Sequence, residues 1–317
     1  MAGIPGIYRW QPQWLLLCPA LIWPVLVAAD IADDRAVAVE KIADGVYVRP
    51  GRIAVLFEAD NVANTAFVVG ERCVAVIDTG GSPAEGRALT AAIRKITQLP
   101  VCFVINTHVH PDHMLGNEAF ERDGVEFIGH KNLPRAMAQR GDTYRQRAAE
   151  YSGNAAHIPK IVLPERTVSG TVQLDLGRRM LTLRAHGTAH TDNDVSVLDE
   201  QSGTLFAGDL VFLDHLPVLD GSINGWLDEL GRLMDKSLRA VVPGHGPGEA
   251  DWPLAAAPTV DYLTSLRAAT RSWIARGGEL GAAQQSIEAA DRDRWRLIDQ
   301  YHKRNVAAAF AELEWED

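Results

Sequence analysis

Short apolar runs, each followed at once by polar residues, recur in the first half of the chain. The clearest occupy residues 65–69, 73–77 and 101–105. Runs of about five apolar residues without a helical period are typical of buried β-strands. Between the second and third runs, Ser82 and Pro83 have the residue types of a helix N-cap and first turn. They predict a helix that continues to about residue 98.

This order of strand, helix and strand indicates a βαβ unit, whose two strands are expected to be parallel. The polar residues Asp78 and Thr107 follow the two strands directly. Both loops should therefore leave the carboxyl ends of adjacent strands, which is where open α/β sheets bind ligands.

The same order of strands and helices returns in the second half of the chain. Residues 132–152 predict a helix, and strands are expected at 171–174, 179–183, 193–198, 204–207 and 239–242, with a helix at 221–238. From Trp252 onward, helical spacing predicts two or three helices, broken at Gly277-Gly278 and near Asp291. The fold class is therefore α/β, with two sheets packed between helices.

The loop after residues 101–105 carries the strongest chemical signal. Its sequence, Thr107-His108-Val109-His110-Pro111-Asp112-His113, places three imidazoles and one carboxylate within six positions. Neutral imidazole and carboxylate are ligands of zinc and similar metal ions. So many ligands in one short loop are not explained by surface polarity or core hydrogen bonding. The loop therefore predicts a metal site.

Three later stretches match this loop to a known family. They are Ala189-His190-Thr191, Ala207-Gly208-Asp209 and Pro243-Gly244-His245-Gly246. With these motifs, residues 40–250 resemble the metallo-β-lactamase-fold hydrolases in order and rough spacing. The resemblance implies a four-layer αββα sandwich at residues 30–250, with a C-terminal helical extension at residues 251–317 packed on it.

The resemblance also implies the roles of individual residues. His108, His110 and His190 would hold one metal ion, Asp112, His113 and His245 the second, and Asp209 would bridge them. Two Zn²⁺ ions are expected, although iron or manganese suits the same ligands. Asp112 and Asp209 are the candidate catalytic residues, because hydroxide shared by two metal ions can attack a carbonyl. Asp78 and Asp194 are expected to orient the ligands. His215 and Trp226 are candidates for the substrate pocket.

Charge and the first residues suggest where the protein acts. The net charge of −10 argues against nucleic-acid binding. Residues 1–29 combine Arg9, an apolar run and small residues before Asp30, which is typical of a secretory signal peptide. An uncleaved membrane anchor is the alternative. We expect export through the general secretory route to a bacterial periplasm, with no stable membrane span after cleavage.

Two cysteines remain after residue 29. Cys73 and Cys102 each lie five residues before the polar end of a strand, and they could be neighbours in a sheet. An oxidising compartment would allow a disulfide between them. Only the distance and orientation of the two cysteines decide whether a disulfide forms, and the sequence does not show them. We expect two buried reduced thiols.

Two further stretches suggest a subgroup. Residues 214–226 and 301–316 resemble the quinoprotein relay system zinc metallohydrolases. This implies a periplasmic binuclear zinc hydrolase tied to a quinoprotein dehydrogenase system. This subgroup has no settled substrate. The leading hypothesis is hydrolysis of a small ester, thioester, lactone or lactam by metal-bound hydroxide.

Two other classes of function are compatible with the motifs. Persulfide dioxygenases share them but use one iron ion. A metal-binding accessory protein without turnover would show no metal-dependent hydrolysis. The substrate and the oligomeric state are left open by the sequence.

Overall fold

The computed structural model describes residue 1 and residues 37–152 and 158–316. The predicted signal peptide lies outside this range, apart from its first residue. None of the helices in the described part of the chain is long and apolar enough to span a membrane.

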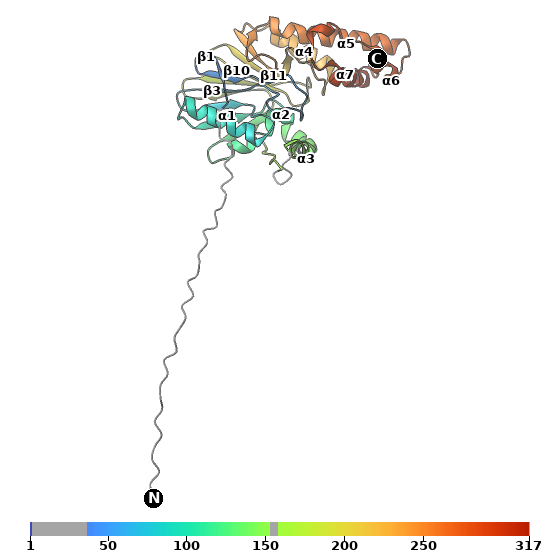
Figure 1. The fold of residues 1–317 in the computed structure, drawn as a ribbon. Helices are drawn as coiled ribbons and strands as arrows, with labels where there is room; N and C mark the ends of the chain where they lie inside the picture. Colours follow the sequence, from blue (N-terminus) through green and yellow to red (C-terminus); the bar gives the residue numbers. More distant parts are fainter. Residues whose placement is uncertain (2–36, 153–157, 317) are drawn as a thin grey trace. The chain divides into compact units, whose positions relative to one another are not determined.

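Two mixed sheets form the centre of the fold (Figure 1). The first sheet has strand order β1-β2-β3-β4-β5-β6-β7 and the second has order β13-β12-β11-β10-β9-β8. The strands of the first sheet are β1 (Glu40–Ala43), β2 (Val46–Arg49), β3 (Thr65–Val69), β4 (Val74–Ile77), β5 (Val101–Ile105), β6 (Glu126–His130) and β7 (Arg166–Val168). Those of the second are β8 (Thr171–Asp175), β9 (Met180–Ala185), β10 (Val195–Asp199), β11 (Thr204–Phe212), β12 (Ala240–His245) and β13 (Ala250–Asp251).

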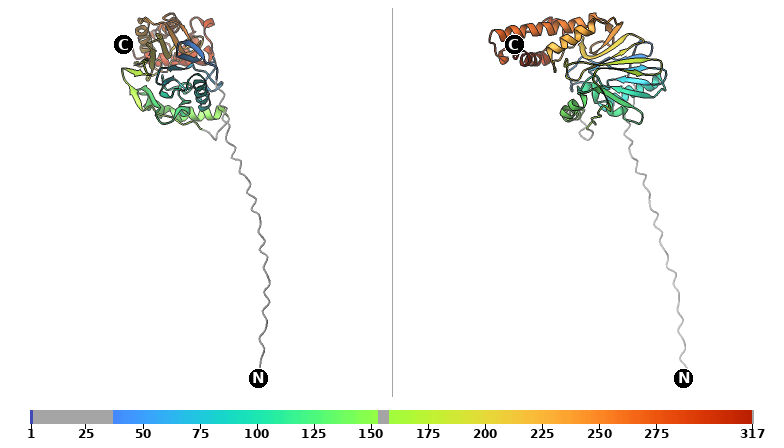
Figure 2. Two further views of the ribbon diagram at one scale, coloured as in Figure 1. Left: turned by 90° about the vertical axis from the view of Figure 1, so that its left-hand side faces the viewer. Right: turned by 180° about the vertical axis from the view of Figure 1, so that it is seen from behind.

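Helices cover both outer faces of the sheets (Figure 2). The α-helices are α1 (Pro83–Ile96), α2 (Pro111–Met114), α3 (Leu133–Ser152), α4 (Ile223–Met234), α5 (Ala257–Ala275), α6 (Leu280–Ser286) and α7 (Ile298–Leu313). Short 3₁₀ helices are η1 (Asn117–Phe120), η2 (Leu254–Ala256) and η3 (Arg292–Arg294). The expected αββα sandwich with C-terminal helices is confirmed.

Alternating side chains of the first sheet explain the layers. In β3, Ala66 and Val68 pack in the core between the two sheets, whereas Phe67 packs with Leu89 of α1 on the outer face. Successive side chains of a strand point to opposite faces, so an apolar run without polar gaps supports two layers at once. The continuous apolar runs in the sequence reflect this burial on both faces.

The C-terminal helices share one core with the second sheet. Tyr262 of α5 and Val306 of α7 belong to the same buried cluster as Val211 of β11 and Trp226 of α4. The helices α5 and α7 therefore extend the layer that α4 begins, and α7 lies within reach of the loop that follows β11.

The structure corrects several expectations about individual segments. Cys73 and Cys102 form a disulfide, with Cα atoms 5.8 Å apart, so the expectation of two reduced thiols was wrong. The reason is the parallel pairing of β4 with β5, where Val74 lies opposite Val101 and brings both cysteines to the same end of the strands. That separation lies in the usual range for disulfides.

One predicted boundary was also wrong. The strand expected at residues 204–207 extends to Phe212, because β11 continues to pair with β12 as far as His245.

Candidate metal centre

The ligand candidates come from both sheets and meet at one edge. His108 and His110 follow β5, and Asp112 and His113 belong to the short helix α2. The remaining candidates lie on the second sheet, with His190 between β9 and β10, Asp209 within β11 and His245 at the end of β12. Strand β5 pairs in parallel with β4, and β12 pairs in parallel with β11. The His108 loop and His245 thus lie at the carboxyl ends of parallel strands, where α/β sheets bind ligands.

These seven residues form two groups that could each hold a metal ion. The first group is His108, His110, His190 and Asp209, and the second is Asp112, His113 and His245. Within each group the ligand atoms lie within 4.8 Å of one another. In the first group, Nδ1 of His110 is 3.0 Å from Nε2 of both His108 and His190. Three imidazole nitrogens therefore converge on one point.

Asp209, which we call the central aspartate, lies between the two groups. Its Oδ2 is 3.4 Å from Nε2 of His190 and 3.4 Å from Nε2 of His245. Its Oδ1 is 3.2 Å from Nε2 of His113. The carboxylate thus contacts imidazoles of both groups, which is the position that a bridging ligand requires.

Unsatisfied atoms show that these residues suit a metal ion. Nε2 of His113 and Oδ1 of Asp209 are buried and have no hydrogen-bond partner among the described residues. A buried polar atom without a partner is costly, and such atoms call for a ligand. Zinc prefers imidazole nitrogen and carboxylate oxygen as donors, usually four of them in a tetrahedral arrangement. The two groups could therefore hold a binuclear metal site.

Each of the five imidazoles is oriented by a hydrogen bond at its other nitrogen. His113 Nδ1 donates to Asp78 at 2.8 Å, and His110 Nε2 donates to Asp220 at 3.0 Å. The three remaining donations are from His190 Nδ1 to the Val218 carbonyl (2.7 Å), from His245 Nδ1 to the Val62 carbonyl (2.9 Å) and from His108 Nδ1 to the Thr107 hydroxyl (3.0 Å). Such partners fix the tautomer and direct the free nitrogen to the metal.

Asp78 links the two motif loops. Besides His113, it accepts hydrogen bonds from the backbone N–H of Thr107 at 2.8 Å and from the Thr107 hydroxyl at 2.7 Å. Asp78 also adopts a left-handed backbone conformation, with φ of 56°. A non-glycine residue at such a φ needs support from its surroundings, and these three hydrogen bonds supply it.

Asp194 has a different position from Asp78. Its carboxylate accepts hydrogen bonds from the backbone N–H and hydroxyl of Thr191, at 2.8 and 2.7 Å. It therefore closes the turn directly after His190 without touching an imidazole of the two groups. Burial raises the pKa of Asp194 to about 8, although the hydrogen bonds from Thr191 act in the opposite direction.

Burial and charge set the protonation of the imidazoles. Burial lowers the pKa of His190 to about 3 and holds the pKa of His108 well below its ordinary value. For His113, burial is outweighed by the carboxylates of Asp209, Asp112 and Asp78, which raise its pKa well above its ordinary value. Neutral imidazole is the metal-binding form, so His190 and His108 are ready to bind at neutral pH.

A glycine makes room for the central aspartate. A Cβ atom at Gly244 would lie 1.9 Å from Oδ1 of Asp209. Real Cβ atoms do not approach other atoms so closely. The Pro-Gly-His motif therefore contains glycine because the carboxylate occupies the space of a side chain.

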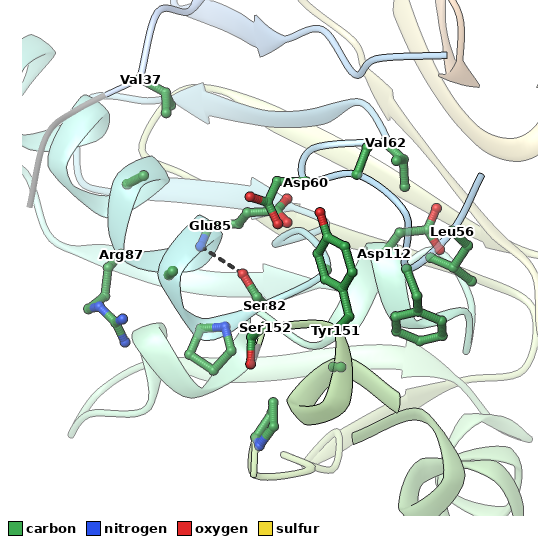
Figure 3. Close-up of a pocket in the computed structure, with 18 of the residues that line it drawn as sticks. Val37, Leu56, Asp60, Val62, Ser82, Glu85, Arg87, Asp112, Tyr151 and Ser152 are labelled. Atoms are coloured by element: carbon green, nitrogen blue, oxygen red, sulfur yellow. Dashed lines mark hydrogen bonds between the residues drawn. The ribbon is translucent and has the colours of Figure 1, made fainter. Parts of the chain in front are cut away.

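Two cavities meet at the metal groups and share Asp112, Leu56, Phe57 and Val62 as lining residues. The larger, of about 830 Å³, extends between α1 and α3. Figure 3 shows Asp112 at one end of it, and Tyr151 reaching from α3 toward Asp60 of the loop between β2 and β3. The smaller cavity, of about 260 Å³, lies directly on the metal groups.

The two candidates for the substrate pocket differ in position. His215 lines the smaller cavity together with Asp209 and His245. Burial lowers the pKa of His215 to about 4, so its imidazole is neutral. Trp226 is fully buried and lines neither of these two cavities, which corrects the expectation. Its indole N–H donates to the Leu210 carbonyl, and its ring packs 5.2 Å from that of His190.

Sequence reasoning did not assign Asp220 or residues of α7 to the metal centre. Asp220 binds His110 and also pairs with Arg140 of α3 and Arg304 of α7. Tyr301 and Arg304 of α7 line the smaller cavity. Asp220 stands beside Gly221-Ser222, which is typical of a turn before a helix, so its side chain was not considered as a partner of His110.

Comparison with solved structures supports the fold. The chain is similar to a metallo-beta-lactamase from Pontibacter korlensis, with 23% identity and a TM-score of 0.60 over 72% of this chain and 98% of that one. It is also similar to a double mutant of the sec-alkyl sulfatase PisA1, with 15% identity and a TM-score of 0.70 over 88% of this chain and 50% of that one. At these identities the likeness concerns the fold alone.

A short segment matches a curated protein more closely. It is 42% identical over 45 residues to a linear primary-alkylsulfatase from Pseudomonas sp. (strain ATCC 19151). The matched segment is 14% of this chain and 8% of that protein, so only a small part of the relative is represented.

The family is identified by a match over a longer segment. The sequence model of the metallo-beta-lactamase superfamily matches residues 59–245. This segment exceeds half of the chain and contains all seven residues of the two metal-binding groups. The chain therefore belongs to the metallo-β-lactamase superfamily.

Proposed function

We propose that this protein is a binuclear zinc hydrolase that cleaves a small ester, thioester, lactone or lactam. The observation that carries the proposal is the convergence of two ligand groups on the central aspartate, Asp209. A site with one metal ion would leave the second group of buried histidines and carboxylate without a purpose.

Asp209, Asp112 and His215 have different roles in the proposed reaction. When bound, two zinc ions would polarise the carbonyl group and lower the pKa of a water molecule. Asp209 contacts both groups and would keep the ions at a fixed spacing. Asp112 lines both cavities, so its carboxylate can accept a proton from water at the site. Neutral His215, with Nδ1 bonded to the Leu216 carbonyl at 2.7 Å, can accept a hydrogen bond through Nε2.

The first test measures metal content and hydrolysis together. We expect about two zinc ions per purified chain, and hydrolysis of ester, thioester or β-lactam substrates that a chelator abolishes and zinc restores. D209N should lose both zinc and hydrolysis, because it removes the charge shared by the two groups. D123N, at an exposed position outside the site, is the matched control and should retain both. One iron per chain without hydrolysis would instead favour a persulfide dioxygenase-like oxidoreductase.

Metal-dependent hydrolysis itself separates the enzyme from an accessory protein. A chain that binds two zinc ions and turns over none of these substrates would support the accessory function, provided that sulfate esters are also tested.

Sulfate esters are a second candidate class of substrate. The observation that favours them is the 45-residue match to a linear primary-alkylsulfatase. Release of sulfate from a primary alkyl sulfate, at a rate above that of carbonyl esters and sensitive to D209N, would replace the carbonyl proposal with this one.

We also propose that the enzyme acts in a bacterial periplasm, in association with a quinoprotein dehydrogenase system. The signal-like residues 1–29 support export, and the Cys73–Cys102 disulfide fits an oxidising compartment. The likeness of residues 214–226 and 301–316 to the quinoprotein relay subgroup supports the association. Cell fractionation tests the compartment, and growth of a deletion strain on alcohols that require a quinoprotein dehydrogenase tests the association.

A further inference from the structure

The smaller cavity is walled by three elements that supply none of the metal-binding residues. The loop between β2 and β3 contributes Leu56 and Phe57, α3 contributes Arg147, and α7 contributes Tyr301 and Arg304. The volume of about 260 Å³ is near the lower end for ligand sites, so the cavity suits a small molecule. A molecule that occupies this cavity therefore lies between the metal groups and side chains from these three elements.

The charges that line this cavity have one sign. Apart from the metal-binding residues, the lining contains two guanidinium groups and no carboxylate in the described part of the chain. Arg147 is exposed and has no ion pair with any described residue. This local positive charge contrasts with the net charge of −10 of the whole chain. Clefts with one sign of charge concentrate ligands of the opposite sign.

Asp220 does not cancel this positive charge. Its carboxylate lies beside the cavity and is already held by Arg140 and by Nε2 of His110, 3.0 Å away. Nη2 of Arg304 lies farther from it, at 3.4 Å, and the Arg304 side chain is 54% exposed. Arg304 is thus positioned by Asp220 while it still faces the cavity. Two cations, Arg140 and Arg304, share one anion, and Arg147 adds a third positive charge.

We propose that this cavity binds a small substrate that carries a carboxylate away from the bond that is cleaved, and that Arg147 and Arg304 hold this carboxylate. The inference rests on the proposed hydrolase function and specifies its substrate. Guanidinium groups pair with carboxylates through two parallel hydrogen bonds, so two of them define both position and charge. Leu56 and Phe57 offer apolar contact to the carbon chain between the two ends. Arg304 lies outside residues 59–245, so its contribution is specific to the C-terminal region of this chain.

Binding of non-hydrolysable probes tests the proposal without turnover. Glutarate and butyrate share one carboxylate and a three-carbon chain, and glutarate adds a second carboxylate at the far end. In calorimetric titrations of the zinc-loaded protein, we expect glutarate to bind at least about tenfold more tightly, as is typical of a charge-assisted pair. R147Q and R147Q/R304Q should reduce and then remove this preference. The control R145Q lies two residues from Arg147 on the same helix, where Arg145 pairs with Asp142, and should retain it.

Equal binding of the two probes by the wild-type protein would overturn the proposal. A preference for glutarate that survives in R147Q/R304Q would also overturn it, because the second carboxylate would then bind the metal ions. R147Q is informative even if the double variant folds poorly, since Arg147 has no described partner to lose.

Rates of ester hydrolysis distinguish a failure of this inference from a failure of the proposed function. The matched substrates are 4-nitrophenyl butyrate and mono-4-nitrophenyl glutarate. In the wild type, kcat/KM should be higher for the glutarate ester than for the butyrate ester. In R147Q/R304Q, the ratio of the two values should approach one. If neither ester is cleaved but the preference for glutarate in binding depends on the two arginines, the hydrolase proposal fails for carbonyl esters and the carboxylate site stands. If both esters are cleaved at equal rates, the carboxylate site fails alone.

Discussion

Replacement of Asn305 by alanine tests whether α7 is part of the metal centre. Asn305 is fully buried, and its side chain holds the loop after β11 on both sides of Val218. Its Oδ1 accepts the backbone N–H of Leu219 at 3.0 Å, and its Nδ2 donates to the Pro217 carbonyl at 2.6 Å. The Val218 carbonyl between them accepts the hydrogen bond that orients His190.

The size of the effect follows from these contacts. N305A leaves one backbone N–H and one carbonyl without partners inside the protein, at a cost of about 1–3 kcal/mol for each. Partial relaxation of the loop reduces the sum, so we expect the free energy of unfolding to fall by about 2–4 kcal/mol. Loss of a group that orients a metal-binding imidazole lowers metal affinity by about 10–100-fold. Zinc affinity should fall by about tenfold, the lower end, because the Val218 carbonyl is displaced and not removed.

The assay combines competition for zinc with a chromophoric chelator and chemical unfolding. N224A is the control, because the Asn224 side-chain amide connects α4 to Glu312 and Glu316 of the C-terminal region and donates no hydrogen bond to residues 217–219. N224A should lower stability and leave zinc affinity unchanged. Unchanged zinc affinity in N305A, or an equal loss in both variants, would refute the reasoning and reduce α7 to a packing element.

Three further predictions concern other parts of the fold. The double variant C73A/C102A opens a loop with a sequence separation of 29, so its free energy of unfolding should be about 3.5 kcal/mol lower than that of the oxidised wild type, measured in denaturant. D199N should destabilise by about 3–5 kcal/mol, because it leaves the buried guanidinium of Arg179 without its charge partner. Burial raises the pKa of Asp199, but hydrogen bonds from Arg179 outweigh it and hold the pKa below its ordinary value. The pair therefore stabilises the protein above about pH 4, and this stability is lost as the pH falls through the lowered pKa, so unfolding curves of D199N should depend less on pH below 4. G244A should abolish zinc binding at both groups while the far-ultraviolet circular dichroism is retained, because its methyl group would occupy the space of the central carboxylate.

Local sequence patterns predicted those parts of the fold that are determined by residues close together in the chain. The five-residue run 101–105 was found with its observed ends because every residue in it is apolar and the next is not. The N-cap of α1 at Ser82 was found because its side chain acts on a neighbour three residues away. The break at Gly277 was found for a similar reason, since a left-handed backbone conformation there follows directly on the end of α5. The break near Asp291 lies between α6 and α7, as expected.

The errors concern features that depend on distant parts of the chain. The continuation of β11 through Asp209 was missed because a carboxylate inside a strand is normally unfavourable, and only the imidazoles of the other loops compensate for it. The disulfide was misjudged because it depends on the register between β4 and β5. The burial of Trp226 reflects packing of α4 against the C-terminal helices, which no local pattern records.

The hydrogen bonds between α7 and the segment before α4 have a consequence for biogenesis. Glu312 accepts hydrogen bonds from the backbone N–H groups of Ile223 and Asn224, at 2.7 and 3.2 Å, and from the Ser222 hydroxyl. Together with Asn305, it secures the loop that orients His190 and His110. Synthesis proceeds from the N-terminal side of a chain, so every metal-binding residue is made before this helix exists. The hydrogen bonds of Asn305 and Glu312 to this loop can form only after residues 298–313 have docked, so we expect the metal centre to reach its full affinity only at that stage. A chain interrupted before this helix would possess every ligand and still lack the support that orients two of them.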